Sequence, residues 1–153
     1  MQILRWSDVA DIFEGDGELL DVHVFGTTWQ DWDQAVAAVR TQGWPIGFSS
    51  VGRPFPRDVR EIFASADELS VSLSIEPVAG PLINTHFLAE NEIVFDLSPA
   101  EVRGQVELDA VCRFLRVVAR AVDKPIVLTP ESLPSRHLLA YDPATDAFAV
   151  QPS

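Results

Sequence analysis

The sequence has few of the side chains that usually build metal or redox sites. Its 153 residues include a single cysteine, Cys112, which excludes an internal disulfide and a cysteine-rich zinc site. The three histidines are His23, His86 and His137. None of them forms a close H-x-H or H-E-x-x-H pair, and an expected turn separates His86 from Glu90 and Glu92. We therefore predict no metal and no cofactor.

Motifs for nucleophilic or nucleotide chemistry are also missing. The chain has no G-x-S-x-G, and the segment VFGTTW (24–29) has one glycine where a phosphate-binding loop needs several. Asp21 and His23 share one face of an expected strand and could form an acid–base dyad, but two surface residues give the same pattern. Carboxylate pairs are frequent in so acidic a chain, so spacing alone assigns none of them a role. We predict that the protein is not an enzyme.

The chain has no long apolar run. No stretch approaches the roughly 20 residues that a membrane span needs. Residues 1–20 show no uninterrupted apolar run flanked by basic residues, so we expect no signal peptide and a cytoplasmic location. Hydrophobic residues make up 47% and charged residues 22%, which is typical of globular proteins. Without repeats or linkers, residues 1–153 are expected to form one domain.

Basic side chains are scarce. Eleven Lys and Arg residues face 23 Asp and Glu residues, which gives a formal net charge of −12. Such a field repels nucleic acid and anionic membranes, and it attracts a basic protein. Solubility alone is the competing explanation for the charge. The acids gather near the N-terminus, and we expect the following residues to bind the partner: Glu14, Asp16, Glu18, Asp31 and Asp33.

The hydrophobic pattern predicts strands over much of the chain. Residues 69–75 alternate aliphatic residues with serine, and 81–89 and 91–98 follow after short turns. Three closely linked strands predict an antiparallel meander. Residues 19–26 and 124–129 are further expected strands, and 137–151 suggest a final hairpin. The serine face is expected to be solvated, although it could also accept a partner.

Apolar residues at helical spacing predict about three main helices. In GTTWQDWDQAVAAV (26–39), Thr28 and Asp31 suit a capping box, and both Trp29 and Trp32 fall on the apolar stripe. Both rings are therefore expected to face the core, and an exposed aromatic site is the alternative. Further helices are expected over 53–66 and 107–122. Cys112 lies on the apolar stripe of the last helix. Its arginine row lies on the opposite face, which is expected to be solvated, although the row could also offset the protein's own acids or touch a partner. The mixed order predicts an α+β fold, with an antiparallel-rich sheet of about five to seven strands and the helices on one face.

Three segments, DVHVFGTTWQDWDQAV, NEIVFDLSPAEV and KPIVLTPES, resemble small bacterial α+β proteins of the immunity-protein class, which accompany polymorphic or contact-dependent toxins. The resemblance covers most of the chain in general layout and carries no catalytic residue. It implies a compact acidic domain that binds a basic toxin domain and blocks its active site.

The sequence therefore favours an inhibitor-like binding module with a basic protein partner. A small ligand-binding protein or enzyme that uses the open sheet face, with His23, His86 and Asn84, is the first alternative. A structural or regulatory homodimer, formed through an edge strand, is the second.

Overall fold

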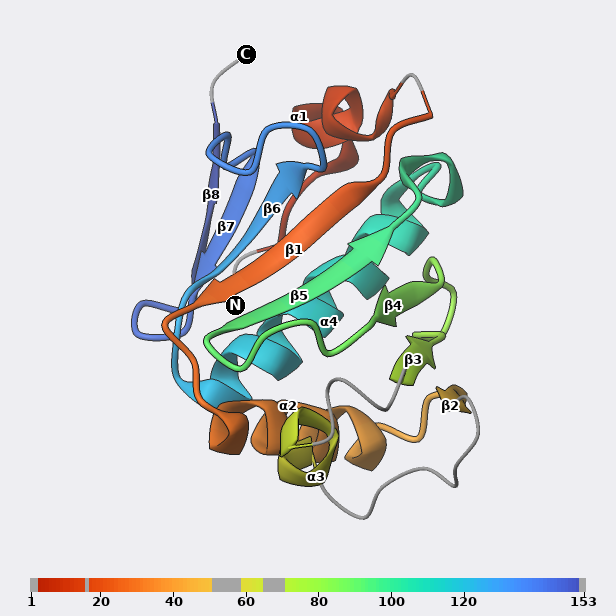
Figure 1. The fold of residues 1–153 in the computed structure, drawn as a ribbon. Helices are drawn as coiled ribbons and strands as arrows, with labels where there is room; N and C mark the ends of the chain where they lie inside the picture. The colour runs from red at the N-terminus through yellow and green to blue at the C-terminus, as the bar shows by residue number, and fades with distance from the viewer. Residues whose placement is uncertain (1–2, 16, 51–58, 65–70, 152–153) are drawn as a thin grey trace.

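The computed structural model describes residues 3–15, 17–50, 59–64 and 71–151 (Figure 1). Its strands form one sheet with the order β2-β3-β4-β5-β1-β6-β7-β8, in which every neighbouring pair is antiparallel. The strands are β1 Leu20–Phe25, β2 Ile46–Ser50, β3 Val71–Ile75, β4 Ile83–Thr85, β5 Glu92–Leu97, β6 Ile126–Pro130, β7 Leu139–Asp142 and β8 Ala147–Val150. The predicted meander is confirmed as β3-β4-β5, and the final hairpin as β7-β8.

Four α-helices and two short 3₁₀ helices accompany the sheet within the described residues. They are α1 Trp6–Val9, η1 Ala10–Phe13, α2 Trp29–Thr41, α3 Val59–Ala64, η2 Pro99–Glu101 and α4 Gln105–Val122. The α+β class is confirmed, and the sheet has eight strands where about five to seven were predicted. Of the helix predicted over 53–66, α3 is described, and residues 53–58, 65 and 66 lie outside the described residues. No described helix is long and apolar enough to cross a membrane.

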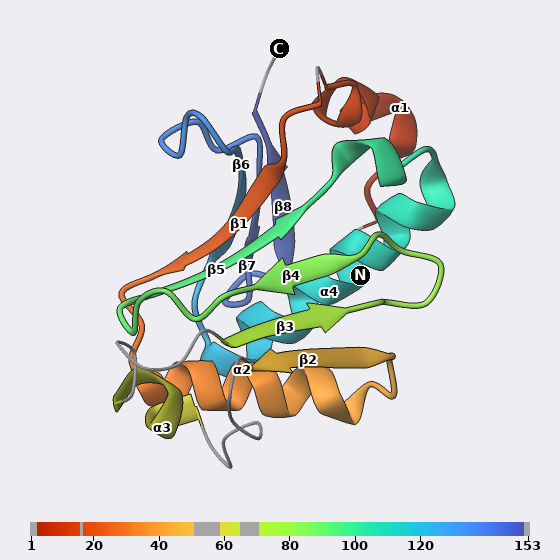
Figure 2. The ribbon, with the colours of Figure 1, turned by 45° about the vertical axis from the view of Figure 1, so that its right-hand side comes forward.

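The two long helices cover the same face of the sheet. In Figure 1, α4 passes behind β1 and β5, and Figure 2 shows α4 on that side in a turned view. The Phe114 ring of α4 meets Phe95 of β5 edge-on at 5.0 Å, and Trp32 of α2 reaches the same Phe95 ring at 6.5 Å. The apolar side chains of the strands alternate onto this covered face, so the main core lies between the sheet and α2 and α4.

Helix α2 starts with the predicted capping box. The Thr28 hydroxyl accepts from the Asp31 amide, and the Asp31 carboxylate accepts from the Thr28 amide. The helix ends before Gly43, which has φ +75°, a left-handed conformation that favours glycine. Together, these two signals explain why the helix boundaries were readable from the sequence.

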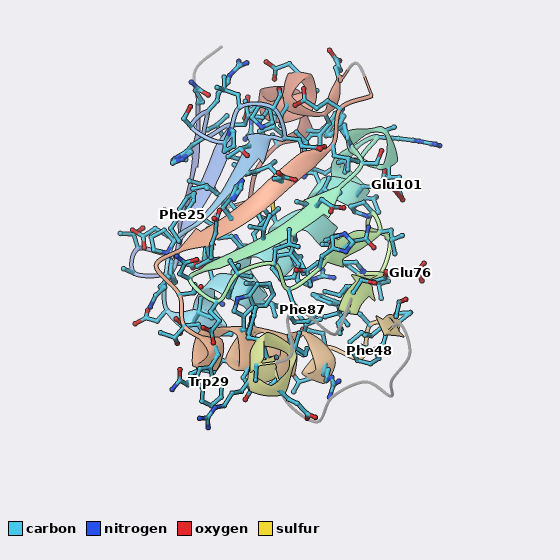
Figure 3. All side chains as sticks on the ribbon, viewed as in Figure 1. Phe25, Trp29, Phe48, Glu76, Phe87 and Glu101 are labelled. Carbon is cyan, nitrogen blue, oxygen red and sulfur yellow. The ribbon has the colours of Figure 1, made fainter. Side chains whose placement is uncertain are left out.

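The two tryptophans of α2 have different environments. Trp32 is buried, and its indole packs on Phe63 and Phe87 and donates to the Ala89 carbonyl at 2.9 Å. Trp29 is half-buried at the start of α2 (Figure 3). The Arg60 guanidinium lies 5.3 Å from the centre of its ring. The prediction that both rings face the core is right for Trp32 only, since Trp29, the first residue of α2, is half-buried.

Candidate binding site on the outer face of the sheet

The sheet face opposite α4 carries a row of polar side chains, and we call this face the outer face. Strand register places Asn84 opposite Asp96, Asp96 opposite Asp21, and Asp21 opposite Thr129. Ser74 extends the row from β3. The row therefore crosses β3, β4, β5, β1 and β6, although its members are far apart in the sequence.

Hydrogen bonds fix one half of this row. Ser74 Oγ donates to Asn84 Oδ1 at 2.8 Å, and Asn84 Nδ2 donates to Asp96 Oδ1 at 3.4 Å. His86 Nε2 lies 3.7 Å from the second Asp96 oxygen. The Asp96 carboxylate is thus held in place by neighbours on β4 and in the turn after it. The serine-bearing face of β3, which was expected to be solvated, therefore takes part in hydrogen bonds within the sheet through Ser74.

Asp21 stands in the other half of the row, beside other acids. Partial burial raises the pKa of the Asp21 carboxyl, and the His23 side chain opposes this shift. The nearby charges of Glu131, Asp96 and Glu18 raise the same pKa further. The fold therefore keeps this carboxylate close to like charges, which is unfavourable in the absence of a partner.

His23 is buried under the outer face and is fixed from two sides. Its Nδ1 donates to Glu92 Oε1 at 2.7 Å, since a carboxylate can only accept, and its Nε2 lies 3.1 Å from the Thr129 hydroxyl. This acid–imidazole–hydroxyl order is that of a nucleophile triad. Thr129 is fully buried, however, and its hydroxyl also bonds to the Pro130 carbonyl, so a substrate cannot reach it as it stands. The arrangement fits a structural role that positions Glu92.

A depression of about 260 Å³ opens on this face. Four carboxylates line it, together with His86 and the apolar side chains of the strands and of the β4–β5 connection. The carboxylates are Asp21, Glu92, Asp96 and Glu131. Leu88, which lines the depression, is 84% exposed. Phe25 is exposed at the end of β1, opposite Glu92 in the strand register (Figure 3). No group of three or more potential ligands among the described residues is arranged to hold a metal ion.

The depression places four carboxylates around apolar side chains. This combination suits a cationic side chain with an aliphatic stem. An Arg or Lys head would meet the carboxylates, and its methylene groups would contact Leu88 or Val94. The outer face is therefore the candidate binding site.

The acids predicted from the sequence lie in two separate places. Glu14 and Glu18 belong to the connection between η1 and β1, whereas Asp31 and Asp33 belong to the first turns of α2, at the other end of β1 (Figure 1). Asp16 lies outside the described residues. The structure therefore does not gather them into one cluster.

Their individual surroundings also differ. The Glu18 carboxylate accepts a hydrogen bond from the Ser132 amide, and its charge acts on Asp21, so it borders the outer face. Asp31 caps α2 and lies 3.6 Å from Lys124 Nζ, so its charge is partly offset. Glu14 and Asp33 are exposed. Of the described members, Glu18 alone adjoins the candidate site.

Sequence reasoning missed Glu92, Asp96 and Glu131 as site residues. The alternation in β5 does place Glu92 and Asp96 on one face, but only the strand order puts that face beside Asp21. Comparisons of the chain with models of protein families, with characterised proteins and with solved structures give no match.

Proposed function

We propose that the protein is a cytoplasmic binding module whose outer face docks a basic protein, in the manner of an immunity protein that inhibits a bacterial toxin. The observation that carries this proposal is the depression in which Asp21, Glu92, Asp96 and Glu131 surround apolar side chains. The partner's Arg or Lys side chains would enter this depression and neutralise the crowded carboxylates.

Electrostatics support a cationic partner in two ways. The net charge of −12 steers a basic protein towards the chain over long range and raises its association rate. At short range, the Asp21 carboxyl has a raised pKa because it is partly buried among other acids, so a bound cation would stabilise its charged form. The net charge of the chain therefore favours encounter with a basic surface, and the crowded carboxylates of the outer face favour its tight docking.

Exposed apolar side chains support a protein partner over a small cation. Leu88 is largely exposed beside the depression, and the Phe25 ring is exposed while it stacks on His23 at 5.4 Å. Aromatic and aliphatic anchors next to desolvated charge pairs are typical of the energetic centre of protein interfaces. A polyamine or a metal ion would leave these side chains in water.

Two charge-matched variants test the proposal. The face variant carries Glu92→Gln, Asp96→Asn and Glu131→Gln, which removes three charges from the outer face. The control carries Glu14→Gln, Asp33→Asn and Glu76→Gln, three exposed acids that do not line the depression. Because the control removes Glu14 and Asp33, the pair also compares the outer face with acids predicted from the sequence.

The partner is first captured from the source cell with the wild-type chain and purified, and its binding to each variant is then measured by surface plasmon resonance. We expect the face variant to weaken binding at least about hundredfold, because desolvated charge pairs are removed. The control should mainly slow association, and high salt should slow association of the wild type. Equal binding of the face variant and the wild type would contradict docking on the outer face.

The inhibitory role needs its own readout. The captured partner is expressed in cells with the wild-type chain, with the face variant or alone. We expect growth to be restored by the wild type and not by the face variant. Binding without any effect on the partner's activity or toxicity would contradict the immunity function and leave the binding module in place.

A further inference from the structure

A second and larger hollow lies on the helix side of the molecule, away from the outer face. It has a volume of about 400 Å³ and is lined by residues of α4 and of the N-terminal segment. Figure 2 shows the chain before α1 running beside α4. Gln105 fixes this segment, because its side chain donates to the Leu4 carbonyl at 2.7 Å and accepts from the Trp6 amide at 2.7 Å. The hollow is therefore built by two elements that are joined by hydrogen bonds.

The floor of this groove is apolar. Leu4 and Cys112 are buried, and Val117 is partly buried beside them. Burial raises the pKa of the Cys112 thiol to about 12, so the side chain stays neutral at physiological pH. Ile3 stands at the rim with 70% of its surface exposed. A ligand with an apolar body would cover this surface.

One wall of the groove carries three arginines of α4. Arg116 is held by aromatic rings, with its guanidinium 4.8 Å above Phe148, and its Nε lies 3.8 Å from an Asp146 oxygen. Arg120 donates to the Tyr141 hydroxyl at 3.0 Å and to the same Asp146 carboxylate at 2.8 Å. These two guanidinium groups are thus preorganised by the β7–β8 hairpin.

The third arginine, Arg113, differs from the other two. It is exposed and makes no ion pair or hydrogen bond within the part of the chain that the structure describes. Asp109 lies one turn earlier, but its carboxylate accepts from Gln105 at 2.8 Å instead. Among the described residues, three arginines therefore face two carboxylates here, Asp109 and Asp146, and the wall is locally cationic on an otherwise strongly acidic protein.

We infer that this groove binds a small organic anion with an apolar body, such as a medium-chain carboxylate, with Arg113 pairing the carboxylate and the apolar floor holding the chain. The volume lies within the range of small-molecule sites, which is roughly 300–1,000 Å³. Guanidinium groups match a carboxylate with two parallel hydrogen bonds. A polyanion such as nucleic acid would instead be repelled by the net charge. This inference does not depend on the proposed function.

The test is a titration with octanoate, followed by calorimetry and by amide chemical shifts. Octylammonium and acetate serve as the ligands that lack the negative charge or the apolar chain. Arg113→Gln is the test variant, and Arg136→Gln is the matched control, since Arg136 is exposed and lies outside the groove. Both changes are on the surface, so both variants should fold, which circular dichroism checks.

We expect one saturable octanoate site, with shift changes at Leu4, Cys112 and Val117. Arg113→Gln should weaken octanoate binding at least about tenfold, because a charge-assisted hydrogen-bond pair is lost, and Arg136→Gln should leave it unchanged. Octylammonium and acetate should shift the amides of these three groove residues much less than octanoate does, whatever octylammonium does at the acidic outer face. The inference is overturned by any of three results: no saturable octanoate binding, equal octanoate affinity in the Arg113→Gln variant, or equal octylammonium shifts at Leu4, Cys112 and Val117.

Discussion

The two faces of the sheet differ in what they contribute, although the same strands supply both. In β1, Val22 and Val24 are fully buried against the helices, while Asp21 and Phe25 on the other side stay accessible. The covered face is built by packing of apolar rings and aliphatic side chains. The outer face is built by hydrogen bonds and crowded charges. Stability thus comes mainly from one face, and the other is available for binding at a cost in stability.

The largest expected effect lies on the covered face. Trp32→Ala should lower the free energy of unfolding by about 3–5 kcal/mol, because it leaves a cavity among three phenylalanine rings and an unpaired Ala89 carbonyl. Trp29→Ala should lower it by about 1 kcal/mol or less, since that ring is half-buried and packs on Arg60. Urea denaturation measures both. Equal losses would place both rings in the core, as the sequence pattern predicted.

A close backbone approach on the covered side gives the next largest effect. A Cβ atom on Gly80 would lie 2.8 Å from the Ala110 Cβ of α4 and 3.3 Å from the Pro77 Cβ. Gly80→Ala should therefore cost about 1–3 kcal/mol of stability. Gly47→Ala is the control, because its Cβ would meet only the Ser74 Cβ at 4.0 Å on the outer face. Thermal unfolding of the two variants compares them, and an unchanged Gly80→Ala protein would show that the loop can move away from α4.

On the outer face, loss of the hydrogen bond between Glu92 and His23 should lower the free energy of unfolding by a smaller amount. Glu92→Ala removes the acceptor of the buried Nδ1–H and should cost about 1–2 kcal/mol. Glu90→Ala, an exposed acid in the preceding turn, should change stability by less than about 0.5 kcal/mol. Chemical denaturation at neutral pH separates the two. Equal values would mean that His23 finds another partner or water when Glu92 is missing.

The smallest effect has the opposite sign. Because the Asp21 pKa is raised above its ordinary value of 3.8, the folded chain binds this proton more tightly than the unfolded chain. The stabilisation that the folded chain gains from binding this proton is therefore lost as pH rises from about 3.8 through the raised pKa. Asp21→Asn should stabilise the protein by a few tenths of a kcal/mol at pH 7, and the gain should vanish at about pH 3.

Denaturation of wild type and Asp21→Asn at both pH values checks this prediction, with the exposed Asp33→Asn as control. A loss of stability at pH 7 in the Asp21→Asn variant would show that the carboxylate is stabilised on this face and not crowded there. That result would also weaken the argument that the outer face needs a cationic partner.

Local sequence signals were sufficient for much of the fold. The alternation of β3, the capping box of α2 and the apolar stripe of α4, including buried Cys112, all appear in the structure. The arginine row of α4 was predicted to be solvated, and this is wrong for Arg116, whose side chain is 13% exposed under Phe148. The alternative, that the row offsets the protein's own acids, fits Arg116 and Arg120, which both lie against Asp146. Helical spacing shows only which residues share a face. It does not show that the β7–β8 hairpin folds over that face.

By itself, the sequence determined the α+β class, the acidic charge and most element boundaries, because these depend on composition and on periodicities of two or about four residues. Only the tertiary structure determined which acidic side chains lie close together on the outer face. Asp21, Asp96 and Glu131 become neighbours because β1 lies between β5 and β6 in the sheet. That strand order comes from burying apolar faces that are distant in the chain, and no local pattern encodes it.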